Sequence, residues 1–283
     1  MKSRIITGLL IGIVVIPLIL LGNIPFMIGI TLLLGGVAYE ISSMHSNPLF
    51  IKIVNILLLG GTSIYNFFNV DSNALYLPIL SIFIPIFIYY AIAVWYEKFD
   101  FKEATFLSLF AILMNIFSKS IFYIRSINDN ANALAFMIIT TCSVDIFALF
   151  VGCKFGKHKL NPRISPKKSI EGSIGGIVCS LVLAFIFNWF FPIFEANGTT
   201  NFLNLSFNSS FALIAPLKVL LLTFALTIIG QLGDLVFSMI KRSYGIKDFG
   251  KLLPGHGGLT DRIDSICFNS IIFQLLFVFL LTL

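Results

Sequence analysis

Residues 5–41 read IITGLLIGIVVIPLILLGNIPFMIGITLLLGGVAYEI, and this stretch decides the fold. Its two apolar runs, 5–21 and 24–41, are separated only by Gly22 and Asn23, which predict a tight turn. A helix needs about 20 mostly apolar residues to cross the hydrocarbon core of a bilayer. No small-residue cleavage site follows the first run, so it is interpreted as an uncleaved span rather than a signal peptide.

Seven further apolar runs follow, and most connections between them are short. The fifth run is the shortest, because Lys119 bounds it. The runs cover residues 49–68, 75–95, 104–117, 134–151, 174–190, 212–236 and 265–281. The sequence therefore predicts an all-α, polytopic integral membrane protein with about nine transmembrane helices.

The composition agrees with a membrane protein and excludes most soluble classes. Of the 283 residues, 58% are hydrophobic and 11% are charged, and the mean hydropathy is +0.98. A soluble domain carries about 25% charged residues, and a disordered chain needs low hydrophobicity. The net charge of +6 is typical of basic cytoplasmic loops, so no nucleic-acid partner is expected. The four cysteines have no zinc or redox spacing, and we interpret them as small apolar fillers.

The cations indicate the direction of the chain in the membrane. With the N-terminus in the cytoplasm, all of the 19 Lys and Arg residues lie inside except Lys119, Arg125 and Lys218. Most of them fall in two predicted cytoplasmic loops, 152–173 and 238–263. We therefore predict scaffold helices in residues 1–130, with possible use in dimerisation, and a catalytic transmembrane region in residues 131–283.

The cytoplasmic end of the eighth span carries a polar face. Asp234, Ser238, Lys241 and Arg242 recur at intervals of three or four residues, so they share one side of a helix. An ionisable group at membrane depth is costly unless it is paired or hydrated, which places Asp234 at a polar cavity. The alternative is a structural ion pair of Asp234 with Lys241 or Arg242.

The following loop has the composition of a phosphate site. Its glycines Gly255, Gly257 and Gly258 allow close backbone approach, and the cations beside them suit phosphate charge: Lys247, Lys251 and Arg262. Asp261 and Asp264 are three residues apart at the start of the ninth span, where helix capping is the alternative role. Hard oxygen ligands beside phosphate-binding cations indicate Mg²⁺, with Asp234 and Asp261 converging on it. His256 contacts phosphate or hydrogen-bonds the loop.

The middle loop offers a second set of candidates. Ser165, Lys167, Lys168 and Ser169 are suited to nucleotide phosphates, and the alternative is that the basic run holds anionic lipid headgroups. Asp145 is an intramembrane acid in the sixth span. Glu171 lies where a helix can begin and favours its N-terminus.

Many of these residues also belong to stretches that resemble the sequence signature of a known family. The stretch 238–264, with Ser238, Lys241-Arg242, Lys247-Asp248-Phe-Gly250 and Leu253-Pro254-Gly255-His256-Gly257-Gly258-Leu-Thr-Asp261-Arg262-Ile-Asp264, resembles the signature of the phosphatidate cytidylyltransferase (CDP-diacylglycerol synthase) family. Phe155-Gly156-Lys157 and Ile164-Ser165-Pro166 with Lys168 and Glu171-Gly172 resemble that family's middle loop. The specific part covers about residues 145–265.

The resemblance implies a function and residue roles. The family converts CTP and phosphatidate into CDP-diacylglycerol and pyrophosphate with Mg²⁺, and a second cation is compatible with it. It implies metal binding by Asp234, Asp261 and Asp264, with Lys241 and Arg262 in catalysis. The substrate contacts implied or suggested are Ser165, Lys167, Lys168, Ser238, Arg242, Lys247, Asp248, Lys251, His256, Gly257 and Gly258. Ile146 and Leu149 depart from the family's usual small polar and aromatic residues after Asp145, so the role of Asp145 is open.

Two rival functions belong to other classes. A transporter of an anionic substrate also carries charges inside its spans, but it predicts paired broken spans in two related halves, and no such repeat is seen. A CTP-dependent lipid-alcohol kinase is the enzymatic rival. The expected partners are CTP, the phosphatidate lipid and the bilayer, and a homodimer is possible. The expected location is a bacterial inner membrane, with the active site facing the cytoplasm.

Overall fold

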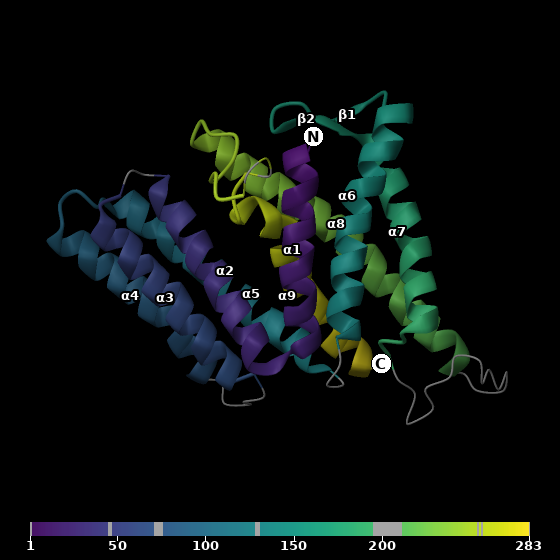
Figure 1. Ribbon diagram of the computed structural model, residues 1–283, viewed down its shortest axis with the longest axis horizontal. Helices are drawn as coiled ribbons and strands as arrows, with labels where there is room; N and C mark the ends of the chain where they lie inside the picture. Colours follow the sequence, from purple (N-terminus) through teal and green to yellow (C-terminus); the bar gives the residue numbers. More distant parts are fainter. Residues whose placement is uncertain are drawn as a thin grey trace. The chain divides into compact units, whose positions relative to one another are not determined.

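The computed structural model describes residues 2–44, 47–70, 76–127, 131–194, 211–253, 255 and 257–282. These residues form nine helices and one two-stranded hairpin (Figure 1). In chain order the elements are α1 Lys2–Leu21, α2 Asn23–Ser43, α3 Leu49–Phe68, α4 Tyr76–Trp95, α5 Phe101–Ser126, α6 Asn132–Phe155, β1 Lys159–Asn161, β2 Ser165–Ser169, α7 Ile170–Phe190, α8 Phe211–Ser243 and α9 Thr260–Thr282.

The helices confirm the all-α membrane fold. Seven of them are long and apolar enough to cross a membrane, and the described parts of the other two contribute the shorter apolar stretches Thr7–Leu21 and Ile79–Trp95. Each predicted span falls within one helix, apart from the first residue of the fourth, which lies outside the described residues. The chain is thus an integral membrane protein built from helices, as its apolar periodicity predicts.

The fifth helix is longer than the predicted 104–117 run. α5 begins after Asp100, whose side chain accepts a hydrogen bond of 2.9 Å from the Glu103 amide, and it continues through Lys119 to Ser126. The charged residues do not end it, because its second half packs inside the protein and Arg125 Nε donates to the Ile19 carbonyl at 2.8 Å. Burial against other helices has replaced lipid as the environment of this segment.

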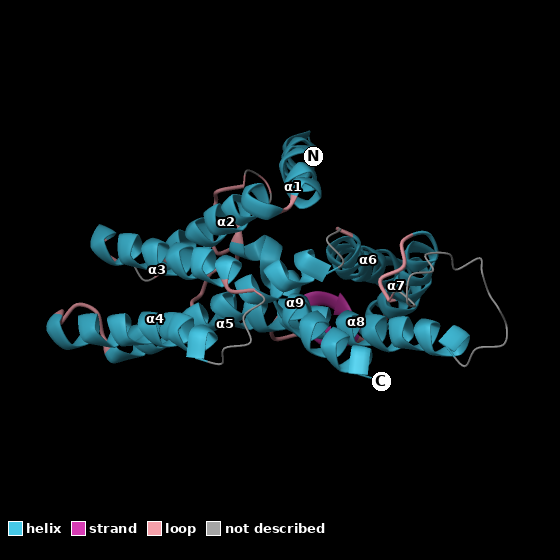
Figure 2. Cartoon of the chain, turned by 90° about the horizontal axis from the view of Figure 1, so that it is seen from below, coloured by secondary structure: helices cyan, strands magenta, loops and turns pink. Residues whose placement is uncertain are grey.

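The chain divides into two compact units. The first contains residues up to 129 together with 243–263, and the second contains residues 130–242 together with 264–283. In the first unit α2 packs on α3, and both α3 and α4 pack on α5 (Figure 2). Buried amides join these helices: Asn55 donates to the Ala38 carbonyl at 2.7 Å and accepts from Tyr89, while Asn66 donates to Asn115 and Ser118.

The second unit is a helix bundle with its closest packing between α6 and α7. Small residues permit this approach, since a Cβ added at Gly176 would lie 2.7 Å from the Val144 carbonyl oxygen. The Ser143 and Ser180 hydroxyls hydrogen-bond at 2.7 Å across the same pair of helices. Elsewhere in the unit, Asn269 of α9 donates to the Thr141 hydroxyl of α6. Figure 1 shows α6 and α7 side by side, joined through the hairpin at one end.

The hairpin forms the middle of the predicted 152–173 loop, and α6 and α7 extend into its two ends. β1 and β2 are antiparallel, with Lys159 opposite Ser169 and Asn161 opposite Ser165. The Ser169 hydroxyl accepts from the Gly172 amide at 3.2 Å, which makes it the N-cap of α7. Glu171 accepts from the Lys157 and His158 amides and from the His158 ring, so it closes the base of the hairpin. The basic run therefore lies on an ordered strand.

Candidate active site

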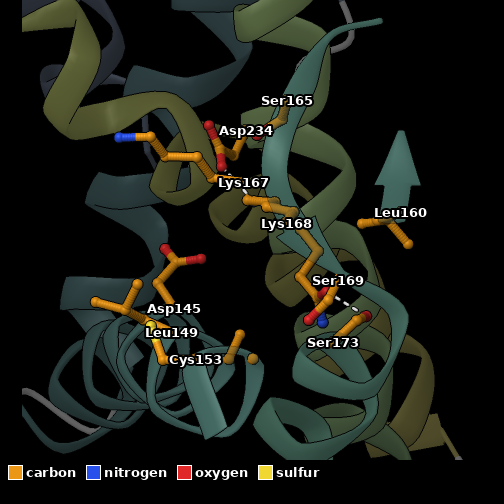
Figure 3. Close-up of a pocket in the computed structure, with 13 residues that line it drawn as sticks. Asp145, Leu149, Cys153, Leu160, Ser165, Lys167, Lys168, Ser169, Ser173 and Asp234 are labelled. Atoms are coloured by element: carbon orange, nitrogen blue, oxygen red, sulfur yellow. Dashed lines mark hydrogen bonds and ion pairs between the residues drawn. The ribbon is translucent and has the colours of Figure 1, made fainter. Parts of the chain in front are cut away.

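A polar cavity of about 360 Å³ lies within the second unit. Its walls come from α6, the hairpin, α7 and α8 (Figure 3). The residues that line it are Asp145, Ala148, Leu149, Gly152, Cys153, Leu160, Ser165, Lys167, Lys168, Ser169, Ser173, Gln231 and Asp234. Five of the candidates from the sequence, four in the middle loop and Asp234 in span eight, therefore line one cavity.

An ion pair in the cavity joins Lys168 to Asp234. The Lys168 ammonium forms an ion pair with Asp234 Oδ2, and Ser238 lies one helical turn further along α8 and donates to Oδ1 at 3.3 Å. The two paired side chains are 26% and 23% exposed, so the charges are partly withdrawn from solvent. Asp234 is thus paired with a cation of β2, while the sequence had suggested Lys241 or Arg242 as a structural partner.

Two further acids belong to the same unit. Asp145 of α6 is exposed toward the cavity, where Figure 3 shows its carboxylate facing the interior. Asp264 of α9 interacts electrostatically with Asp234, Lys241 and Asp145. Lys241 is buried, with 8% of its surface exposed. Three carboxylates and three lysines, Lys167, Lys168 and Lys241, therefore contribute charge to this site.

The carboxylates do not form a complete metal site by themselves. Among the residues that the structure describes, no group of three or more His, Cys, Asp or Glu side chains could hold a metal ion. Mg²⁺ commonly binds through one or two protein carboxylates and completes its shell with water and substrate phosphates. The pair Asp234 and Asp264 has the chemistry of such a partial site, because both are oxygen ligands and their charges influence one another.

The predicted glycine loop lies in the first unit. Gly255 and Gly257 have φ of 80° and 83°, a conformation that favours glycine, and the Leu253 amide donates to the Gly257 carbonyl at 3.0 Å. Around this turn the candidate side chains Lys247, Asp248, Lys251 and Arg262 are exposed. The loop thus presents its charges outward. His256, together with Pro254, lies outside the described residues.

Asp261 organises the inside of this loop. Its Oδ2 accepts from the Phe249 amide at 2.9 Å and from the Gly258 amide at 3.0 Å. Asp261 is 7% exposed and lies in the first turn of α9, but both of its donors precede the helix, so it ties the loop together rather than capping α9. Asp264 follows one turn later, and its Oδ1 accepts from the adjacent Ser265 amide.

The sequence reasoning missed one buried acid, Glu40 of α2. Its carboxylate accepts from the Leu259 and Thr260 amides, both at 2.9 Å, and from the Thr260 hydroxyl at 2.8 Å. Only 2% of Glu40 is exposed. The available signal was that Glu40 is the one charged residue in the whole of α2.

Comparison with known proteins identifies a family and several related proteins. The sequence model of the cytidylyltransferase family matches residues 2–280. The chain is 35% identical over 278 residues to a phosphatidate cytidylyltransferase of Bacillus subtilis (strain 168), covering 95% of this chain and 94% of that protein. It is 31% identical over 270 residues to the same-named protein of Staphylococcus saprophyticus, and 30% identical over 273 residues to that of Staphylococcus aureus (strain COL), with 95% of each chain covered.

Proposed function

The chain belongs to the cytidylyltransferase family, and from this membership we propose that it converts CTP and phosphatidate into CDP-diacylglycerol and pyrophosphate. In this reaction a phosphate oxygen of the lipid attacks the α-phosphorus of CTP, and the bond to pyrophosphate breaks. The nucleophile is already an anion, so no strong general base is required. The site must offset the repulsion between two anions and align them.

The observation that carries the proposal is the charged cavity of the second unit. Asp145 and Asp234 lie in apolar helices, where charges are costly, and Lys167 and Lys168 of the hairpin line the same cavity. Such groups are expected where a charged substrate binds. Ser165, Lys167 and Lys168 are proposed to contact the phosphates of CTP from the hairpin.

A divalent cation fits the acids of this unit. We assign Mg²⁺ to Asp234 and Asp264; when bound it supplies neutralisation of phosphate charge. Asp261 lies one turn before Asp264 on α9, and it remains a proposed ligand on the sequence pattern alone. The buried ammonium of Lys241 is proposed to stabilise the charge that develops during transfer.

The remaining candidates are proposed as substrate contacts from the exposed loop and the end of α8. These are Ser238, Arg242, Lys247, Asp248, Lys251, His256, Gly257, Gly258 and Arg262. Their cations suit phosphate and the anionic lipid surface. Because CTP is soluble and the lipid is not, both substrates meet at the membrane interface, which we place on the cytoplasmic side of a bacterial inner membrane.

Two radiolabels distinguish the proposed reaction from its rivals. Purified protein in lipid nanodiscs is given phosphatidate, a lipid alcohol such as diacylglycerol, Mg²⁺ and CTP labelled with ³²P at either the α- or the γ-phosphate. We expect label in the lipid phase from α-labelled CTP only, with release of pyrophosphate. Lipid labelling from γ-labelled CTP would indicate a kinase, and absence of label from both would refute the transferase. Asp234→Asn protein serves as the inactive control.

A further inference from the structure

Glu40 forms a helix cap supplied from a distant part of the chain. Its carboxylate accepts from the amides of Leu259 and Thr260, which lie 219 and 220 positions later in the sequence. Unpaired amides at a helix start are normally satisfied by a residue next to the helix. Here Asp261 takes the Gly258 amide from within α9, and Glu40 of α2 takes the next two.

The loop is built around the Glu40 carboxylate. A Cβ added at Gly250 or at Gly258 would lie closer than 3.0 Å to carboxylate atoms of Glu40. These two positions therefore need glycine because the acid occupies the adjacent space. Thr260 is fully buried and donates its hydroxyl to the same carboxylate. Three donors and two close glycines converge on one side chain.

These contacts allow Glu40 to fix the position of the turn that begins α9. A buried carboxylate in an apolar helix is unfavourable, and among the described residues its hydrogen-bond donors all come from the turn that begins α9. Any rotation or shift of that turn would break these hydrogen bonds. The acid therefore fixes the start of the helix from which Asp261, Arg262 and Asp264 project.

We propose that Glu40 is a positioning residue for nucleotidyl transfer, acting through the Leu259–Thr260 turn on the acids of α9. The proposal rests on the proposed function of the chain. Glu40 itself touches neither substrate in this scheme. Partners that orient ligand side chains typically change metal affinity or activity by about 10–100-fold when they are altered.

The principal variant is Glu40→Gln, compared with Asn55→Ala. Glutamine keeps the shape of the side chain but turns an NH₂ group toward backbone donors. Asn55 is the matched control, because it is equally buried in the same unit and bonds Ala38 and Tyr89 rather than the loop. Both proteins are purified in nanodiscs, and activity is expressed per folded molecule.

Two readouts separate positioning from general stability. Hydrogen–deuterium exchange of the peptide covering residues 249–262 should be faster in Glu40→Gln and unchanged in Asn55→Ala. The kcat for α-label transfer should fall, or the half-saturating Mg²⁺ concentration should rise, by about 10–100-fold in Glu40→Gln. The KM for phosphatidate should stay constant. Asn55→Ala should lower only the melting temperature.

Thr260 provides a second route if Glu40→Gln folds poorly. Thr260→Val removes the hydroxyl donor and should show the same changes to a smaller degree, while Thr260→Ser should restore wild-type values. Wild-type exchange and wild-type Mg²⁺ dependence in Glu40→Gln would overturn the proposal, as would losses that match those of Asn55→Ala per folded molecule. An inactive wild-type protein would refute the proposed function first, before any variant is compared.

Discussion

The ammonium of Lys168 occupies the position beside Asp234 that a bound metal ion would take. It contacts Asp234 Oδ2 directly, in a cavity that Asp145 also lines. A carboxylate oxygen cannot serve an ammonium and a divalent ion equally well at one time, so the two cations compete for Asp234. In the proposed reaction the arriving phosphates give Lys168 a second anionic partner.

Replacing Lys168 with methionine should therefore strengthen metal binding to the nucleotide-free protein. A charge-assisted contact contributes about 1–3 kcal/mol, and loss of the competitor should lower the Kd for Mn²⁺ by about tenfold. Titration followed by electron paramagnetic resonance measures this directly. Lys167→Met is the matched control, because Lys167 is the exposed neighbour on β2. An unchanged Kd in Lys168→Met would contradict the competition.

Asp145 provides a second prediction for single side chains, because the sequence left its role open. Asp145→Asn keeps the size of the side chain and removes a charge that acts on Asp264. We expect the Mg²⁺ concentration for half-maximal α-label transfer to rise by about tenfold. This is the lower end of the effect of about 10–100-fold seen when residues around metal ligands are altered. Asp145→Glu, which keeps the charge, should lie nearer the wild type. Equal Mg²⁺ dependence of all three proteins would exclude an electrostatic role.

Among the elements, the α6–α7 pair is the one whose spacing positions the cavity. The two helices approach closely at Gly176, and they are joined by the hairpin that carries Lys167 and Lys168. The hairpin base is fixed by Ser169 and Glu171 through backbone amides. The lysines therefore project from a hairpin whose two ends join packed helices.

The helix pair allows a test with a matched glycine. A Cβ at Gly176 would lie 2.7 Å from the Val144 carbonyl and 3.2 Å from the Ala148 amide nitrogen, both backbone atoms. Gly176→Ala should lower stability by about 1–3 kcal/mol through overpacking. Gly61→Ala on α3 meets nothing within 4 Å and should be neutral or stabilising by up to about 1 kcal/mol. Thermal unfolding in nanodiscs measures both, and equal melting temperatures would contradict this explanation.

The whole molecule shows how far sequence reasoning extends. α3 begins and ends where its apolar run does, because Pro48 precedes it and polar residues follow Phe68. The sequence predicts a boundary at Lys119, but α5 continues to Ser126 because its second half is buried against other helices. Apolar periodicity reports contact with lipid, and it weakens where helices bury polar side chains against each other.

The site was less predictable than the fold for a related reason. Asp234, Lys168 and Ser165 are candidates on the sequence because polar residues in an apolar chain stand out, and the structure places all three at one cavity. The hairpin was not expected, because strands of three and five mostly polar residues show no alternation of hydrophobicity. Glu40 was missed because its partners are backbone amides, and no residue type at Leu259 marks that contact.

Sidedness is the prediction that belongs to the whole chain. The positive-inside pattern predicts that Lys167 and Lys251 face the cytoplasm and that Ser126 faces outward. Single cysteines placed at these positions in a cysteine-free background should react accordingly with a membrane-impermeant maleimide. We expect labelling of Ser126→Cys in intact cells, and of Lys167→Cys and Lys251→Cys only after lysis. The reverse pattern would invert the assigned direction.

The Glu40 cap also has a consequence for how the protein is made. A ribosome delivers Glu40 to the membrane 219 residues before Leu259, so the nascent chain carries an acid without these partners through most of its synthesis. A chain that stops short of Leu259 keeps this defect permanently. Truncated products should therefore be recognised and degraded faster than truncated Glu40→Gln chains, a difference that pulse-chase labelling measures. The lifetime of a chain that contains Glu40 should therefore depend on whether Leu259 and Thr260 have been synthesised.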